Sequence, residues 1–239
     1  VVAPETNITV DVDAILAAVT DTTRIVFIAN PNNPTGTYIP GADVISLREG
    51  LREDIVLVLD GAYAEFMTGA DYEPGLALAS DSPNTIMTRT FSKIHGLASL
   101  RVGWAYGPKT IIDVLERLRS PFNINASAIA AAAAAMRDTD HTADAAAHNI
   151  RWMGVSLQCL RALGLEIIGE SANFVVPRFP DTHGYTAADA DVYLQQKGII
   201  ARRVTDYGLP NHLRITLGTD EEMEVVLSAL TKFMGGDDG

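Results

Sequence analysis

The sequence has little cysteine and no long apolar run, and these absences exclude several classes of protein. Cys159 is the single cysteine among 239 residues, so no internal disulfide framework can form. Because Cys159 lies in a pattern of helical spacing, we predict a small buried side chain there rather than a nucleophile. No apolar run is long enough to span a bilayer, so no membrane-spanning helix is expected.

Positive charge is also scarce. The chain has 18 Lys and Arg residues against 30 Asp and Glu residues, for a formal net charge of -12. No cluster of basic side chains offers a footprint for nucleic acid, and an anionic membrane surface would repel the chain. We therefore expect neither nucleic acid nor a membrane as a partner.

The start of the chain has neither the basic region nor the hydrophobic segment of a signal peptide, and we expect a cytoplasmic protein. Val1 stands where a methionine would begin a reading frame, which indicates a chain that begins inside a longer reading frame or was processed. The sequence also has no spacing of His, Cys, Asp and Glu that is typical of a metal site, and no glycine-rich nucleotide fingerprint.

The composition is that of a globular protein, with 47% hydrophobic and 20% charged residues, and its length suits one large domain or two unequal ones. In the first half, short apolar runs alternate with segments of helical spacing. Strands are predicted at residues 24–29, 55–60, 85–90 and 102–107, with a helix over about 41–53. This alternation predicts an α/β fold with a mainly parallel sheet flanked by helices.

The character of the sequence changes after Asn123. Further helices are predicted over 125–137, 140–164, 186–197 and 219–234, and strands over 174–176, 198–202 and 213–217. Thr219, with Glu222 three residues on, has the pattern of a capping box at the start of the last helix. We predict a partial large α/β domain over 1–122, connecting helices over 123–165 and a small α+β domain over 166–239.

Polar side chains follow the predicted strands at their C-terminal ends, which is the edge where open α/β sheets bind ligands. Lys93 comes after such a strand and after two hydroxyl residues, Thr90 and Ser92. A lone lysine is ordinarily a solvated surface charge, but these neighbours favour an amine that forms an imine beside a phosphate held by hydroxyl and backbone N–H groups. Arg101 would add a planar, permanently charged clamp for that phosphate, or else form a surface salt bridge.

Three upstream residues complete the set. Asp60 ends an apolar strand, and a carboxylate buried there would need a cation such as a pyridinium nitrogen; the alternative is a helix N-cap over 61–66. Tyr63 could reach the same ligand or be a packing tyrosine. Asn33 lies in a proline-rich loop, where its amide could donate to a ring oxygen or serve a plain turn.

The last strand carries an arginine, Arg214, between two apolar residues. It must either point outward from an edge or face an anion such as a substrate carboxylate. Arg202 at the end of the preceding strand and Asn173 before another strand are further candidates for the same cleft. His95 is isolated, and a structural role is predicted for it.

A lysine for an imine, a carboxylate for a ring nitrogen, a phenol and an amide for a ring oxygen, and an arginine for a phosphate together describe a pyridoxal phosphate site. The chain resembles the fold-type I aminotransferases of class I/II that depend on pyridoxal 5'-phosphate (PLP), and is most similar to their histidinol-phosphate aminotransferase branch. The matching segments, in the family's order, are 30–36, 60–63, 92–103, 171–174 and 213–218. The resemblance implies a three-layer PLP-dependent transferase-like fold and a homodimer.

The resemblance also implies a role for each residue. Lys93 would hold the cofactor as a Schiff base and catalyse a 1,3-proton shift, while Asp60 would pair with the pyridine nitrogen. Tyr63 and Asn33 would hydrogen-bond the phenolic oxygen of the ring. The phosphate would be held by Thr90, Ser92 and Arg101. Arg214 would bind the α-carboxylate of the substrate.

The implied reaction is ping-pong transfer of an amino group to a 2-oxo acid from an amino acid or amino-alcohol phosphate, of the histidinol phosphate or aromatic type. Family members have an N-terminal part before the position matching Val1, with a dimer arm, a phosphate loop and a ring-stacking aromatic. The chain is therefore either a fragment or a naturally shortened enzyme with a more open site. The alternatives are a truncated PLP-binding domain or scaffold, and a PLP-dependent decarboxylase of a phosphorylated amino acid.

Overall fold

Two units with separate cores make up the chain, of which the computed structural model describes residues 1–3 and 5–235. The first unit comprises residues 1–32 and 38–146, and the second comprises residues 33–37 and 147–239. The division falls within the long helix α6 (Thr139–Ala162), whereas the sequence-based division places connecting helices over 123–165. The short segment 33–37 therefore belongs with residues far from it in the sequence.

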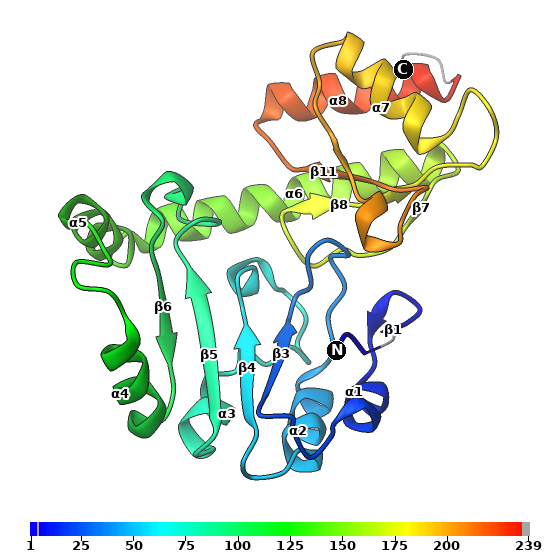
Figure 1. Cartoon of the computed structure of the whole chain (residues 1–239). Helices are drawn as coiled ribbons and strands as arrows, with labels where there is room; N and C mark the ends of the chain where they lie inside the picture. Colours follow the sequence, from blue (N-terminus) through cyan, green and yellow to red (C-terminus); the bar gives the residue numbers. More distant parts are fainter. Residues whose placement is uncertain (4, 236–239) are drawn as a thin grey trace. The chain divides into compact units, whose positions relative to one another are not determined.

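A four-stranded sheet in the order β3-β4-β5-β6 organises the first unit (Figure 1). Its strands are β3 (Ile25–Ala29), β4 (Val56–Asp60), β5 (Thr85–Thr90) and β6 (Gly103–Tyr106). The first three are parallel and β6 is antiparallel to β5, which confirms a mainly parallel sheet. Because Asp60 pairs with Thr88 in the register, the segments that follow β4 and β5 begin at the same edge of the sheet.

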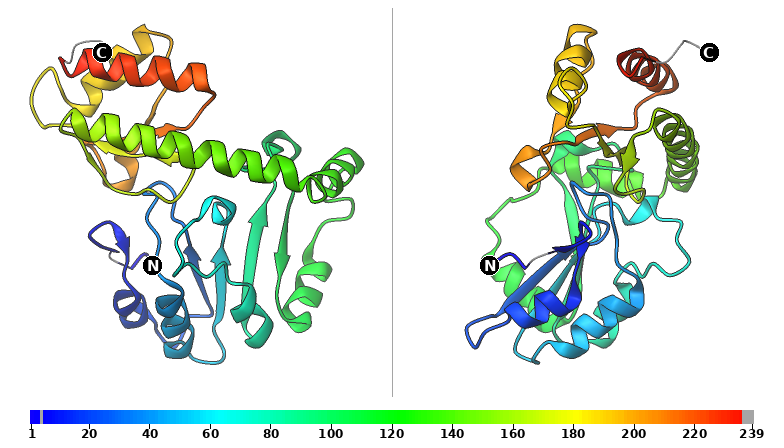
Figure 2. Two further views of the ribbon diagram at one scale, coloured as in Figure 1. Left: turned by 180° about the vertical axis from the view of Figure 1, so that it is seen from behind. Right: turned by 90° about the vertical axis from the view of Figure 1, so that its right-hand side faces the viewer.

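Helices α1 (Val12–Ala18), α2 (Gly41–Gly50) and α3 (Leu76–Asp81) cover one face of this sheet. The first two contact each other and lie beside the sheet in Figure 2. The core on this face contains Ile28, Val44, Leu47, Leu51, Ile55, Leu57, Leu59, Ala79 and Met87. The opposite face of β3 is open, since the Phe27 side chain is 70% exposed.

The first unit also contains a hairpin and two further helices. Their bounds are β1 (Glu5–Thr6), β2 (Thr9–Val10), α4 (Lys109–Leu118) and α5 (Ala126–Ala135). The side chain of Asn125 accepts a hydrogen bond from the Ala128 N–H at the start of α5, which satisfies one of the N–H groups left unpaired at a helix start. The alanine-rich segment is thus a helix, as predicted, and Asn125 caps its start.

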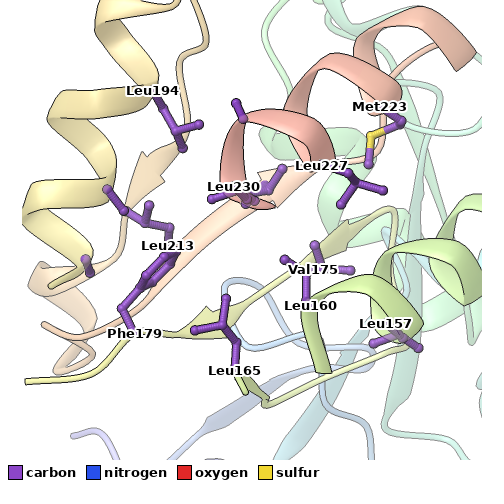
Figure 3. Close-up of a cluster of buried hydrophobic side chains, with 14 of the residues drawn as sticks. Leu157, Leu160, Leu165, Val175, Phe179, Leu194, Leu213, Met223, Leu227 and Leu230 are labelled. Carbon is purple, nitrogen blue, oxygen red and sulfur yellow. The ribbon is translucent and has the colours of Figure 1, made fainter. Parts of the chain in front are cut away.

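The second unit has a three-stranded antiparallel sheet in the order β10-β11-β8. Its strands are β8 (Phe174–Val175), β10 (Arg202–Arg203) and β11 (Leu213–Thr216), and a separate pair is formed by β7 (Glu166–Ile167) and β9 (Pro177–Arg178). Helices α7 (Ala187–Gln196) and α8 (Asp220–Phe233) pack with α6 around one core (Figure 3). Members of that core include Leu157, Leu160, Leu165, Val175, Phe179, Leu194, Leu213, Met223, Leu227 and Leu230.

The start of α8 confirms the predicted capping box. Thr219 accepts a hydrogen bond from the backbone of Glu222, and the Glu222 side chain accepts one from the backbone of Thr219. Thr186 and Asp189 form a second capping box at α7. Each such cap contributes about 1 kcal/mol, and together they determine where the two helices begin.

The strand predicted over 198–202 is wrong for most of its length. Gly198 adopts a left-handed φ of 78°, and its N–H donates to Gln195 while the N–H of Ile199 donates to Leu194. These backbone groups therefore close the end of α7 instead of pairing with a neighbouring strand. Ile200 is left 88% exposed, and only Arg202–Arg203 forms a strand.

None of the helices within residues 1–3 and 5–235 combines the length and the apolar character that crossing a membrane requires.

Candidate functional site

The turn that follows β4 presents a carboxylate at the edge of the sheet. Asp60 is exposed, so its expected burial is wrong, and its Oδ1 accepts a hydrogen bond of 3.1 Å from the Ala62 N–H. The short helix after it spans Ala64–Phe66 with Tyr63 as its N-cap, so Asp60 is not the N-cap of a helix. The carboxylate instead closes a tight turn and keeps one oxygen for other partners.

Lys93 and Tyr63 lie together, although they follow different strands. The Nζ atom of Lys93 is 5.1 Å from the centre of the Tyr63 ring. Tyr63 is 3% exposed, whereas Lys93 is half-buried between the buried residues Phe91 and Ile94. The structure thus places an amine and a phenol side by side at the edge where Asp60 ends its strand.

Hydroxyl groups and a guanidinium gather around the same turn. The Ser92 N–H donates to Thr90 Oγ1 at 3.0 Å, and an Arg101 terminal nitrogen donates to Ser92 Oγ at 3.3 Å and to the Ala98 carbonyl at 2.7 Å. Arg101 adopts a left-handed φ of 53° and is the C-cap of the short helix Ala98–Leu100. Two hydroxyls and one guanidinium in this arrangement can bind a phosphate by charge-assisted hydrogen bonds.

Asn33 and Arg214 meet in the second unit, 181 positions apart in the sequence. A terminal nitrogen of Arg214 donates to Asn33 Oδ1 at 2.6 Å, and the guanidinium lies 4.9 Å from the centre of the Phe174 ring. The Ser171 N–H donates to the Gly36 carbonyl at 3.0 Å, which holds the segment 33–37 in this unit. Arg214 is half-buried on the central strand of its sheet, so it is not an outward-pointing residue of an edge strand.

The weaker substrate candidates lie on the same three-stranded sheet. Arg202 is opposite Arg214 in the register, is exposed, and donates to the Tyr207 hydroxyl at 3.1 Å. The carbonyl of Asn173 accepts from the Leu217 N–H at 2.9 Å, which joins the start of β8 to the end of β11. A cavity of about 880 Å³ opens beside Arg202 and Arg214.

Two residues that were predicted to be structural do pack against neighbours. The His95 ring lies 5.0 Å from the Phe91 ring, and Cys159 packs against the core of the second unit. Cys159 is half-buried, not fully buried. Among the described residues, no group of three or more His, Cys, Asp and Glu side chains could hold a metal ion.

Arg89 is a site residue that the local sequence patterns do not single out. This side chain is only 8% exposed, and it donates to the Gly61 carbonyl inside the Asp60 turn at 3.0 Å. An arginine near the end of the predicted strand 85–90 was the available signal. Its partners are in other segments of the chain, so spacing alone could not assign them.

Comparison with known proteins places this geometry in a family. The family model for aminotransferase class I and II matches residues 1–230. The chain is 55% identical over 232 residues to histidinol-phosphate aminotransferase of Maricaulis maris, and 52% identical over 235 residues to that of Rhodopseudomonas palustris. These matches cover 97% and 98% of the chain and 64% of each relative.

The fold is also similar to that of a solved relative. Histidinol-phosphate aminotransferase from Sinorhizobium meliloti, in complex with pyridoxal-5'-phosphate, matches with a TM-score of 0.85 and 29% identity over 94% of this chain and 61% of that one. The chain therefore spans less than two thirds of the length of these relatives. Because the family model matches nearly all of it, the chain belongs to the aminotransferase class I and II family.

Proposed function

We propose that this protein is a PLP-dependent transaminase that moves an amino group from histidinol phosphate, or from an amino acid of the aromatic type, to a 2-oxo acid such as 2-oxoglutarate. One observation carries the proposal: Lys93 Nζ lies 5.1 Å from the Tyr63 ring, at the sheet edge where the exposed carboxylate of Asp60 ends β4. Identities of 52% and 55% to two histidinol-phosphate aminotransferases support this choice of substrate.

The side chains of the first unit fit PLP in their chemistry. Arg101 and Ser92 are within 3.3 Å of each other and, with Thr90, would hold its phosphate. Asp60 has an exposed carboxylate for the ring nitrogen, and the adjacent phenol of Tyr63 would donate to the ring oxygen. The amide of Asn33, which belongs to the second unit, is a further candidate donor to that oxygen. When bound, the cofactor supplies an electron sink for the bonds of the substrate carbon that carries nitrogen.

The protein residues would orient the substrate and move its proton. Lys93 Nζ would remove the proton from the carbon that bears the amino group and later return a proton, as a general acid and base. Asp60 would keep the ring nitrogen protonated through an ion pair.

Arg214 would bind the anionic end of the substrate. Its planar guanidinium pairs equally well with a carboxylate and with a phosphate ester, so one arginine can serve the 2-oxo acid and histidinol phosphate in turn. Arg202 and Asn173, on the same sheet, are further candidates for this contact. The family resemblance also supports a homodimer, which sedimentation analysis of the purified protein would test.

Titration of the purified protein with PLP tests the proposal. We expect a visible absorbance band from the lysine-bound cofactor in the wild type and in Lys109→Ala, whose side chain is 84% exposed, but none in Lys93→Ala. Histidinol phosphate and 2-oxoglutarate should then exchange their amino group. No band in the wild type, or a band that persists in Lys93→Ala, would contradict the proposal.

The same experiment separates the alternatives. A band without amino-group exchange from any donor supports the cofactor-binding scaffold. Release of carbon dioxide from a phosphorylated amino acid, without a 2-oxo acid product, supports the decarboxylase.

A further inference from the structure

An arginine with a buried side chain contacts the turn that follows Asp60, next to the residues proposed to bind the cofactor. Arg89 is near the end of β5 (Thr85–Thr90), four positions before Lys93, and its side chain is 8% exposed. Removing a guanidinium from water is costly unless its N–H groups are paired. Its terminal nitrogens donate to the carbonyls of Gly61 at 3.0 Å and of Pro74 at 3.1 Å, and its Nε is 3.5 Å from Glu65 Oε1.

Gly61 is shaped to receive this guanidinium. A Cβ atom at Gly61 would lie 1.7 Å from the terminal nitrogen of Arg89, so any larger residue would displace the arginine. The Gly61 N–H donates to the Thr88 carbonyl at 3.0 Å, while its carbonyl accepts from Arg89. Thr88 and Arg89, two successive residues of β5, therefore bind the N–H and the carbonyl of Gly61.

The neighbouring groups leave Glu65 as the charged partner of Arg89. Burial raises the pKa of Tyr72 to about 12, so this phenol is neutral at physiological pH and donates to the Asn30 carbonyl at 2.8 Å. The planar guanidinium is thus held by the carbonyls of Gly61 and Pro74, the Glu65 carboxylate and the Tyr72 hydroxyl. A lysine ammonium group cannot reproduce this forked set of contacts.

We infer that Arg89 is a positioning residue that fastens the turn from Asp60 to Tyr63 onto the strand that leads to Lys93. The inference rests on the proposed function, in which these three side chains act on one cofactor. Groups on separate strand ends must keep a common geometry, because a displacement of about 1 Å can lower a rate about 100-fold. Arg89 provides that connection without touching substrate or cofactor.

Arg89→Lys tests the inference, because it keeps a cation beside Glu65 but removes the forked donor. We expect the cofactor-free variant to fold. Its amide hydrogen exchange over residues 61–64 should be at least about 10-fold faster than in the wild type, because losing a hydrogen bond from a charged donor permits local opening. Exchange over the core of the second unit should be unchanged. The affinity for PLP should fall at least about 10-fold, and the pH midpoint of its absorbance band should shift. The fold decrease in kcat should exceed the fold increase in KM.

Two further variants make the result decisive. Gly61→Ala retains the arginine but displaces its guanidinium, and it should reproduce the same local exchange and the same shifted midpoint. Glu65→Gln removes the ionic partner and leaves the contact with Gly61, so it should lower the melting temperature without moving the midpoint. If Arg89→Lys and Gly61→Ala change the melting temperature but leave local exchange and the midpoint as in the wild type, the inference is overturned.

The exchange measurement needs no cofactor, so it separates this inference from the proposed function. If the wild type forms no absorbance band, the proposed function fails, and the exchange over 61–64 alone decides whether Arg89 holds the turn. If the band forms but exchange in Arg89→Lys is uniform along the chain, the proposed function stands and the inference fails.

Discussion

The two units present their proposed functional side chains in different ways. In the first unit, Asp60 and Lys93 stand in turns that follow parallel strands. In the second unit, Arg214 lies within the central strand β11 and is paired to Asn33, 181 positions away. A polar residue after an apolar strand is visible in the sequence, because the edge of the sheet is a common ligand site. A polar residue inside a strand acquires its role from whatever packs against it.

Replacing Arg214 by alanine is the most direct test of whether the two units contribute different contacts. We expect KM for the 2-oxo acid to rise by an amount corresponding to about 2–5 kcal/mol, because a charged hydrogen-bonding partner is lost. The affinity for PLP should change far less, since the proposed cofactor contacts are mainly in the first unit. Steady-state kinetics and a PLP titration measure the two effects. Equal losses of both would refute the assigned role, and Arg214→Lys provides the matched charged control.

Large-to-small substitutions in the two cores test whether the units are energetically separate. Leu57 in the first unit and Leu230 in the second are both fully buried at 0% exposure. Each leucine-to-alanine change should cost about 2–5 kcal/mol, and calorimetry should show that each lowers the transition of its own unit. A single transition that moves equally in both variants would show that the two cores unfold together.

The pH dependence of stability should differ between the units because of His212. This side chain is 5% exposed, and neither ring nitrogen has a hydrogen-bond partner within the described residues. Burial, with a smaller contribution from the Arg178 guanidinium, lowers the pKa of His212 below 6.5, and the Glu166 carboxylate only partly opposes this. The unfolded chain therefore takes up a proton first as the pH falls.

The stability that the neutral His212 contributes is thus complete above about pH 6.5, and it is lost as the pH falls toward the lowered pKa. We expect chemical denaturation of the second unit to show this loss as the pH falls below about 6.5. His212→Leu should flatten the dependence, whereas His183→Leu, at an exposed position, should leave it unchanged. A dependence that persists in His212→Leu would assign it to another group.

The smallest expected effect concerns the helix caps of the second unit. Thr219→Ala removes the acceptor for the Glu222 N–H at the start of α8 and should cost about 1 kcal/mol. Thr186→Ala should cost a similar amount at α7, because the same capping box is present there. Denaturant unfolding that shows no change for either variant would indicate that packing alone determines where these helices begin.

Much of the fold was predictable from local patterns. The apolar runs at β3 and β4, the alanine-rich α5 and the capping box of α8 each have a short-range signal in the sequence, and the structure contains all of them. The run at 198–202 was misassigned, because a glycine with a left-handed φ used the neighbouring N–H groups to close α7. Hydrophobic content alone does not distinguish a backbone that pairs in a strand from one that closes the end of a helix.

The sequence by itself determined which candidate residues are present and in what order: Asp60 and Tyr63 after one strand, Lys93 and Arg101 after the next. These assignments follow from neighbours close in the chain. Only the tertiary structure decided that Asp60 is exposed, that Arg214 meets Asn33, and that Arg89 occupies the space left by the missing side chain of Gly61. Such contacts join distant segments, and their geometry depends on how whole strands pair and pack.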